Sequence, residues 1–245
     1  MKFISTLFIL FALSFTAITA ESNSHWSYQG KTGPASWGSL DSDYSLCETG
    51  KNQSPINITN AIKASLSELN FDYVTDVASI KNNGHSIQTN IAEGSSVVIN
   101  AKTFNLLQFH FHSPSEHHVN GNSYPLEVHF VHADKDMNLA VVGVFFEESS
   151  EENNVFKDIL KMAPKKEGEK KVKKSIDYKR LIPNDKSYYR LNGSLTTPPC
   201  SEGVTWVVMK EIQPISKKQV DKYYKIFGFD ANRPVQPLNA RVVAE

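Results

Sequence analysis

The chain has 245 residues, a length that suits one large domain or two small ones. Its 26 basic and 26 acidic side chains balance. This balance argues against a general binder of nucleic acids or other polyanions, because such proteins carry an excess of positive charge. Hydrophobic residues make up 40% of the chain, which indicates a folded main body rather than a disordered one.

The first 20 residues differ from the rest of the chain. Lys2 supplies a positive start, a mostly apolar stretch follows, and Thr19 and Ala20 are small residues suited to a cleavage site. This order is typical of a secretory signal peptide, which we expect to be cut near Ala20. The alternative is a membrane anchor, but the run is short for a span and is interrupted by Ser and Thr. We therefore expect a periplasmic or secreted protein in which residues 21–245 form one domain.

The remaining pattern is dominated by short strands separated by turn signals, after an irregular strap over residues 25–58. The apolar run 139–146 predicts a strand buried on both faces. Apolar residues at helical spacing predict helices over residues 153–162 and 216–227. The Lys-rich run 165–174 could bind an acidic partner, but such runs are more often solvated loops, and we favour a loop. The predicted fold class is mainly β (α+β), with a few short peripheral helices.

Cys47 and Cys200 are the two cysteines of the chain. Exported proteins meet oxidising conditions, so a single disulfide is the first hypothesis, and two buried free thiols are the alternative. In the chain-entropy model, a bridge across so long a loop contributes roughly 2–5 kcal/mol of stability.

Six of the eight histidines lie between residues 110 and 132. Polar and apolar residues alternate over residues 106–112, and side chains two positions apart on a strand share a face. Gln108, His110 and His112 therefore point one way, and the two imidazoles could chelate one metal, although a lone H-x-H motif is weak evidence. The opposite face, directed into the core, carries Leu107, Phe109 and Phe111.

A second segment, residues 126–132, shows the same arrangement of polar side chains on one face of a strand, because Glu127 and His129 share a face. A turn signal at residues 120–122 separates the two segments, so they could be neighbouring antiparallel strands. His129 would then complete a three-histidine site, and three nitrogen ligands with one open position are usual for catalytic zinc. Gln108 and Glu127 each lie two residues from a histidine on the same face, where they could accept its other N–H.

The first segment also fits a different kind of metal site. His110, His112 and Glu116 form an H-x-H-x-x-x-E pattern that overlaps the first cupin signature. In that case Glu116 would be a ligand, and the metal would be iron, manganese or copper. The glycines that flank the cupin motif are missing, since positions 104 and 123 are Phe and Ser, and the sequence has no second cupin motif. We therefore set this alternative aside.

Several ordered motifs together resemble the α-carbonic anhydrases. They are HWSY at 25–28, QSPINI at 53–58, NNGH at 82–85, QFHFH at 108–112, SEH at 115–117, EVH at 127–129, GSLTTPP at 193–199, VTW at 204–206, NRP at 232–234 and QPL at 236–238. The resemblance spans about residues 25–238. It implies a large, twisted, mostly antiparallel sheet with zinc at the base of a conical cavity.

The resemblance also implies an activity, the reversible hydration of carbon dioxide to bicarbonate and a proton by attack of zinc hydroxide. Zinc would be held by His110, His112 and His129. The Thr196 hydroxyl would accept a proton from the hydroxide and donate its own to Glu116, since an ionised carboxylate can only accept.

His85 matches the proton shuttle of the family, and an exposed imidazole, which titrates at about pH 6.5, suits proton transfer near neutrality. The resemblance implies further roles for other positions. The apolar wall for CO2 would be Val131, Val141, Leu195 and Trp206, contact with bicarbonate or water would come from Thr197, and the water chain would be ordered by Tyr28, Asn83 and Gln88. Gln88 departs from the asparagine common at its position. Cys47 and Cys200 match a disulfide of exported members, which are often homodimers.

A non-catalytic binding module related to carbonic anhydrases is the remaining alternative. Such modules typically lack one or more of the zinc histidines, whereas this chain has all three, together with Glu116 and Thr196. We therefore expect a zinc enzyme that acts on a small molecule. We expect no nucleic-acid partner and no membrane contact after cleavage of the signal peptide.

Overall fold

A computed structural model describes residues 25–245 of the chain. The expected signal peptide, residues 1–20, lies outside this range and stays a prediction. Within residues 25–245, no helix is long and apolar enough to cross a membrane.

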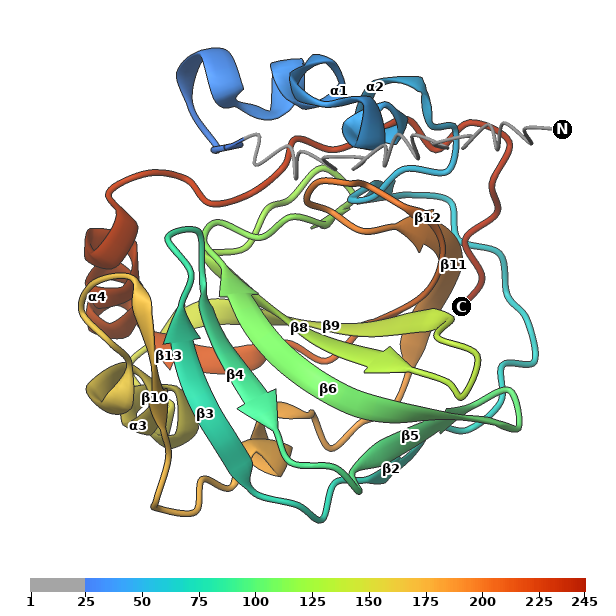
Figure 1. Ribbon diagram of the computed structural model, residues 1–245. Helices are drawn as coiled ribbons and strands as arrows, with labels where there is room; N and C mark the ends of the chain where they lie inside the picture. The colour runs from blue at the N-terminus through green and yellow to red at the C-terminus, as the bar shows by residue number, and fades with distance from the viewer. Residues whose placement is uncertain (1–24) are drawn as a thin grey trace, which may run out of the picture.

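The fold is built on one twisted, 11-stranded sheet (Figure 1). Its main path is β10 (Gly168–Lys171), β3 (Val77–Asn82), β4 (Ile87–Ile91), β6 (Lys102–His112), β8 (Leu126–Ala133), β9 (Leu139–Ser149), β12 (Glu202–Met209) and β11 (Tyr188–Ser194). Beside this path, β13 (Gln213–Ser216) pairs with β9, and β2 (Asn70–Asp72) pairs with β5 (Ser96–Ile99), which pairs with β6. Strand pairs are antiparallel except that β12 and β13 run parallel to β9. The predicted mainly antiparallel β fold is confirmed.

The strands in the middle of the sheet are buried on both faces. All residues of β8 are buried, and β9 is buried from Ala140 to Phe146, as the apolar run predicted. One face of the sheet packs Phe109, Phe111 and Phe130 into the main core. The other face carries His110 and His112 of β6 and His129 of β8, and His110 lies opposite His129 in register.

Leu107 was expected in the core, and this expectation is wrong. The register of β6 against β8 shifts between Leu106 and Gln108, so that an extra residue is inserted at position 107. This bulge turns Leu107 outward, where it is exposed, and buries Leu106 in its place. Simple alternation along the sequence could not show the inserted residue.

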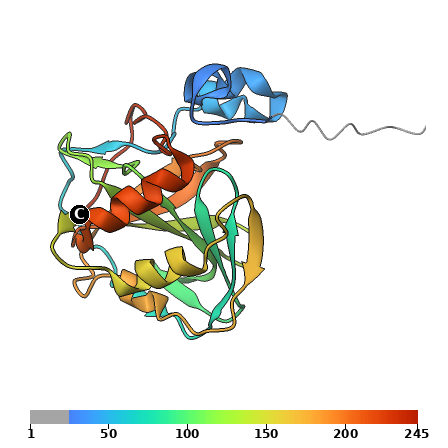
Figure 2. The same ribbon diagram turned by 90° about the vertical axis from the view of Figure 1, so that its left-hand side faces the viewer.

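The two predicted helices form and cover the outer face of the sheet (Figure 2). The helix α3 (Asn154–Met162) begins after Asn153, whose side chain accepts a hydrogen bond from the backbone N–H of Phe156 at 3.0 Å. The helix α4 (Lys217–Phe227) begins with a capping box between Ser216 and Gln219. It ends at Gly228, whose φ of 76° is left-handed.

The charged run 165–174 was expected to be a loop, and this is wrong for its middle part, which forms the edge strand β10. The four residues of β10 are exposed and pair antiparallel with β3. A strand exposed on both faces has no apolar alternation, so its sequence carries no strand signal. Charged side chains on such an edge oppose pairing with another chain.

The opening strap lies at the top of Figure 1, coloured blue, and packs around the buried Trp37. It contains short helical turns rather than purely irregular chain: three 3₁₀ turns (Gly30–Thr32, Pro34–Ser36 and Ser42–Tyr44), α1 (Trp37–Leu40) and α2 (Leu46–Thr49). The remaining small elements are the 3₁₀ turn Tyr178–Leu181 and a parallel pair of β1 (Asn57–Ile58) and β7 (His118–Val119). A disulfide joins Cys47 in α2 to Cys200, so the expected bridge is present.

Candidate metal centre and its surroundings

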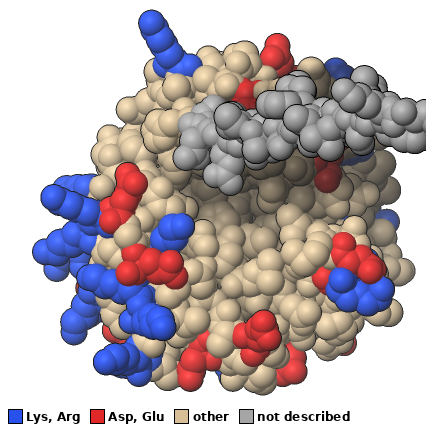
Figure 3. All heavy atoms as spheres, viewed as in Figure 1, with Lys and Arg blue, Asp and Glu red and all other residues tan. Residues whose placement is uncertain are grey.

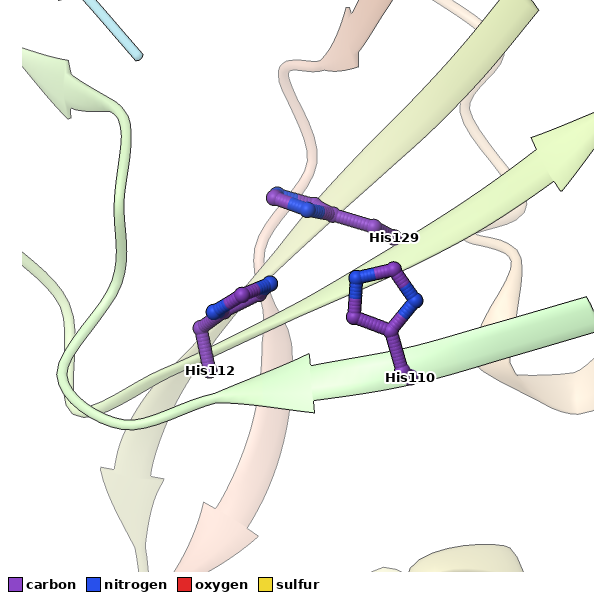
Figure 4. Close-up of side chains that lie close together, drawn as sticks. All are labelled: His110, His112 and His129. Carbon is purple, nitrogen blue, oxygen red and sulfur yellow. The ribbon is translucent and has the colours of Figure 1, made fainter. Parts of the chain in front are cut away.

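Three histidines from two neighbouring strands meet at one point. His110 on β6 lies directly opposite His129 on β8, and His112 lies opposite Glu127. One ring nitrogen from each of His110, His112 and His129 lies within 4.8 Å of the others. Figure 4 shows the three rings turned towards one another. The antiparallel pairing and the shared face that the sequence predicted are both confirmed.

The second nitrogen of each ring faces a fixed oxygen. His110 Nδ1 lies 2.9 Å from Oε1 of Gln108. His112 Nδ1 lies 2.8 Å from the backbone carbonyl oxygen of Ala231, and His129 Nε2 lies 2.8 Å from Oε1 of Glu127. These contacts leave Nε2 of His110, Nε2 of His112 and Nδ1 of His129 directed inward. The sequence predicted the Gln108 and Glu127 contacts, but a backbone carbonyl such as that of Ala231 has no side-chain signature.

The electrostatics of the cluster favour neutral imidazoles on β6. Burial lowers the pKa of His110 well below its ordinary value, and the neighbouring His112 and His129 lower it further. Burial also lowers the pKa of His112. For His129 burial acts in the same direction, but the carboxylates of Glu127 and Glu116 together outweigh it and raise the pKa. Neutral imidazole is the form that binds a metal, so two ligands are already in that form.

Two buried atoms directed into this cluster need a partner that the described chain does not supply. Among residues 25–245, Nε2 of His112 and Oε2 of Glu116 have no hydrogen-bond partner. Buried polar atoms in folded proteins are nearly always satisfied, and an exception calls for an explanation such as an ion. A metal held by the three histidines would satisfy His112, so the residues fit a metal.

Glu116 is fully buried beside the histidines. Its Oε1 accepts a hydrogen bond from the backbone N–H of Arg233 at 2.8 Å, and its Oε2 lies 3.4 Å from Nε2 of His112. Thr196 is also buried, but Oε2 of Glu116 has no hydrogen-bond partner in the described part of the chain. The link from Thr196 to Glu116 therefore stays a prediction.

The expected apolar wall forms one contiguous cluster. Val131, Val141 and Trp206 are buried together, and Leu195 packs against them. The Trp206 ring lies 4.9 Å from the ring of His129, and its Nε1 donates to the backbone oxygen of Ser194 at 2.9 Å. Thr197 lies in the adjacent loop, where its carbonyl oxygen accepts from the backbone N–H of Cys200 at 2.9 Å.

His85 was expected to be exposed, and it is instead half-buried. Its ring stacks on Trp26, with centroids 3.9 Å apart and planes at 15°. Burial, together with the neighbouring His25, lowers the pKa of His85 below its ordinary value, and Glu167 opposes this in part. The sequence missed the stack because Trp26 and His85 are far apart along the chain.

The residues expected to order a water chain lie near His85 but are held by protein contacts. Asn83 Oδ1 accepts from the backbone N–H groups of His85 at 3.0 Å and Ser86 at 2.7 Å, so it shapes the turn that carries the imidazole. The Tyr28 ring lies 6.1 Å from that of His85. Gln88 lies opposite His110 in register, and its Nε2 donates to Oδ1 of Asn90 at 2.6 Å.

Two buried side chains around the site received no role from the sequence. His117 lies between Glu127, at 3.0 Å from Nδ1 to Oε1, and Trp206, at 4.5 Å between ring centroids. The Arg233 guanidinium donates to Oε1 of Gln53 and to backbone oxygens in the strap, each at 2.8 Å. His117 lies in the SEH motif and Arg233 in the NRP motif, and membership of these motifs was the sequence signal that could have identified them.

Comparison with known proteins settles the family. Residues 32–245 match the model of the eukaryotic-type carbonic anhydrases. The chain belongs to the carbonic anhydrase family. Its activity is therefore the reversible hydration of carbon dioxide, and the cupin alternative is wrong. In agreement, the metal cluster contains His129 rather than Glu116.

Individual relatives cover nearly the whole chain. A carbonic anhydrase of Neisseria gonorrhoeae is 41% identical over 99% of this chain and 96% of its own length. The α-carbonic anhydrase of Thermovibrio ammonificans, solved with the inhibitor sulfanilamide, is 48% identical with a TM-score of 0.88, over 91% of this chain and 99% of that one. The α-carbonic anhydrase of Photobacterium profundum is 45% identical with a TM-score of 0.85, over 90% of this chain and 100% of that one.

Proposed function

We propose that this carbonic anhydrase works with Zn²⁺ held by Nε2 of His110, Nε2 of His112 and Nδ1 of His129. The observation that carries the proposal is the convergence of these three nitrogens while their outer nitrogens face Gln108, Ala231 and Glu127. Three nitrogen ligands leave one tetrahedral position open, as in catalytic zinc sites. Zinc bound there supplies Lewis-acid chemistry that makes water nucleophilic at neutral pH.

Glu116 and Thr196 would orient the nucleophile. An ionised carboxylate can only accept hydrogen bonds, so a Thr196 hydroxyl that reaches Oε2 of Glu116 must donate to it. The same hydroxyl oxygen is then available only as an acceptor on its other side. The nucleophile would therefore donate to Thr196 and direct a lone pair towards CO2. Free Oε2 beside His112 supports this assignment.

The apolar cluster of Val131, Val141, Leu195 and Trp206 would bind CO2. This substrate has no net dipole and gains little from polar partners, so a dry wall holds it while excluding water. Thr197, which lies in the neighbouring loop, would contact the bicarbonate product. The burial of Val131, Val141 and Trp206, and the position of the Trp206 ring beside His129, support this wall.

His85 would carry the released proton towards solvent. The imidazole is only half-buried, so part of the ring can reach water, whereas its Nδ1 is buried and has no hydrogen-bond partner among the residues that the structure describes. Tyr28, Asn83 and Gln88 would order the intervening water. The stack on Trp26 would hold the imidazole in one orientation.

We also propose that residues 1–20 direct export to the periplasm or the medium and are removed. The Cys47–Cys200 disulfide supports an oxidising compartment. Mass spectrometry of the exported protein would test this directly, since it should begin close to Glu21. Association into a homodimer remains part of this proposal, and sedimentation of the purified protein would decide it.

The deciding experiment is stopped-flow CO2 hydration, with metal content measured on the same sample. We expect fast hydration and one zinc per chain, with loss of both in His110→Ala. Sulfanilamide, the named inhibitor in the Thermovibrio ammonificans complex, should inhibit hydration. A chain that binds zinc but hydrates no CO2 would be a binding module, and one loaded with iron or manganese would contradict the proposed metal.

A further inference from the structure

A groove lies between α3 and α4 on the outer side of the molecule, remote in sequence from the histidine strands. Its volume is about 460 Å³. Four apolar residues and four lysines line it: Leu160, Ala163, Pro164 and Ile226, with Lys161, Lys165, Lys222 and Lys225. We call this feature the lysine groove. All four of its lysines are exposed.

The lysines of the groove differ from other lysines of the same helices in their partners. Lys157 in α3 pairs with Glu152, and Lys217 in α4 pairs with Asp221 at 2.8 Å. Within residues 25–245, no carboxylate lies within 4.0 Å of any of the four groove lysines. Neighbouring like charges such as Lys222 and Lys225, three positions apart on α4, weaken a helix. An external anion would relieve this repulsion.

The positive charge extends beyond the groove over one face of the protein. Figure 2 shows α3, α4 and β10 side by side on this face, and Figure 3 shows basic side chains (Lys and Arg) gathered at its margin. The strand β10 adds the exposed Lys170 and Lys171. The acidic Glu169 of the same strand is directed onto β3 and β4, where its Oε1 accepts hydrogen bonds from Ser79 and Asn90.

The chemistry of the groove favours a lipid surface over other anions. Its positive charges are all lysine ammonium groups, which act as point charges, and none is an arginine fork suited to bidentate recognition. No aromatic residue lines it to stack a nucleic-acid base. Its apolar floor lies beneath the charges, as in surfaces that meet lipid headgroups and the first methylenes of the chains.

We propose that the lysine groove and the adjoining β10 dock this enzyme on an anionic phospholipid surface. This departs from the expectation of no membrane contact after cleavage of the signal peptide, and it is compatible with the balanced net charge of the chain. Net charge does not report a local excess on one face. Figure 3 shows a hollow near its centre, over β6 and β8. This hollow is separate from the edge of the molecule where the basic side chains gather. Docking would therefore leave CO2 access to that hollow open.

Co-sedimentation with lipid vesicles tests the proposal on the purified, zinc-loaded enzyme. Vesicles of phosphatidylcholine with about one-third phosphatidylglycerol are compared with pure phosphatidylcholine. The test variant carries Lys161→Gln, Lys165→Gln, Lys222→Gln and Lys225→Gln. The matched control carries the same charge change at exposed lysines outside α3, α4 and β10, namely Lys31→Gln, Lys51→Gln, Lys63→Gln and Lys135→Gln.

We expect binding to the anionic vesicles alone, weakened by salt. Each lysine near an anionic surface contributes roughly fivefold in partitioning, so the test variant should bind at least tenfold more weakly than the control variant. CO2 hydration and the melting temperature of both variants should match the wild type. Equal binding by the two variants, or no wild-type binding, would overturn the proposal. Binding to duplex DNA or to polyglutamate but not to vesicles would overturn it too.

Discussion

Oε1 of Glu127 lies 2.8 Å from Nε2 of His129, and both side chains are buried. The N–H of His129 is not aligned on that oxygen, so the contact is electrostatic. Oε2 of Glu127 accepts the backbone N–H groups of Glu116 at 2.8 Å and His117 at 2.9 Å. Burial alone would raise the pKa of Glu127, but His129 and His117 together hold it well below its ordinary value. An ionised Glu127 therefore fixes the orientation of His129.

Glu127→Gln should weaken zinc binding by roughly 10- to 100-fold, the usual effect of removing an acceptor behind a metal-bound histidine. An amide cannot accept on both sides, so its NH2 group would face either the backbone donors or the histidines. Competition with a chelator measures the affinity. Glu147→Gln, at an exposed position of β9, is the matched control. Equal zinc affinity in both variants would show that Glu127 does not position His129.

His85→Ala should slow the maximal turnover by on the order of 10²-fold in weak buffer, because proton removal loses its relay. The ratio kcat/KM should change little, since His85 is not proposed to touch CO2. Added imidazole should restore turnover by accepting the proton from solution. A fall in kcat/KM of the same size would place His85 in the hydration step instead.

Trp26→Ala provides a second test of the same group. The stack on Trp26 is part of the burial that lowers the pKa of His85. Removing the indole should therefore move that pKa upward, towards the value of about 6.5 for a free histidine. An NMR titration of the His85 ring gives the midpoint directly, and a turnover–pH profile should shift in the same direction. An unchanged midpoint would mean that His25 alone sets the shift.

His132 should make the protein sensitive to acid. Its Nε2 lies 2.8 Å from the Tyr73 hydroxyl, and burial lowers its pKa to about 4. An unfolded histidine titrates at about 6.5, so the unfolded chain binds more protons between these values. Stability is therefore lost as the pH falls through this window, by up to about 3 kcal/mol.

Urea unfolding of zinc-free protein at several pH values between 7 and 4 tests this assignment. In His132→Gln the loss of unfolding free energy on acidification should be smaller than in the wild type, whatever the variant's stability at pH 7. His25→Gln, at an exposed position, should keep the full loss. An identical pH dependence in His132→Gln would rule out His132 as the source.

The Cys47–Cys200 bridge spans 153 positions, and we predict that it pins the loop that carries Thr196 and Thr197. In the chain-entropy model a loop of this length contributes about 5 kcal/mol. Reduction, confirmed by counting free thiols, should lower both the melting temperature and CO2 hydration. Cys47→Ser with Cys200→Ser should reproduce the result without reductant. Unchanged melting and turnover after complete reduction would show that the bridge holds neither the fold nor the loop.

Local patterns in the sequence predicted a large part of this structure. The alternation around His110 predicted a strand with histidines on one face, and the helical spacing before Pro164 predicted α3. These predictions succeed because side-chain direction along a single strand or helix follows from its repeat. The same reasoning misplaced Leu107, since one inserted residue reverses the alternation.

The sequence by itself determined the ligand types, the motif order and hence the family, because these depend on residue identity and short spacing. Only the tertiary structure decided which distant groups meet. Three features each bring together segments that are separated along the chain. They are the Ala231 carbonyl behind His112, the stack of Trp26 on His85, and the lysines without carboxylate partners between α3 and α4. Such contacts depend on how the sheet twists and how the strap and helices pack on it. No periodicity within one segment encodes that packing.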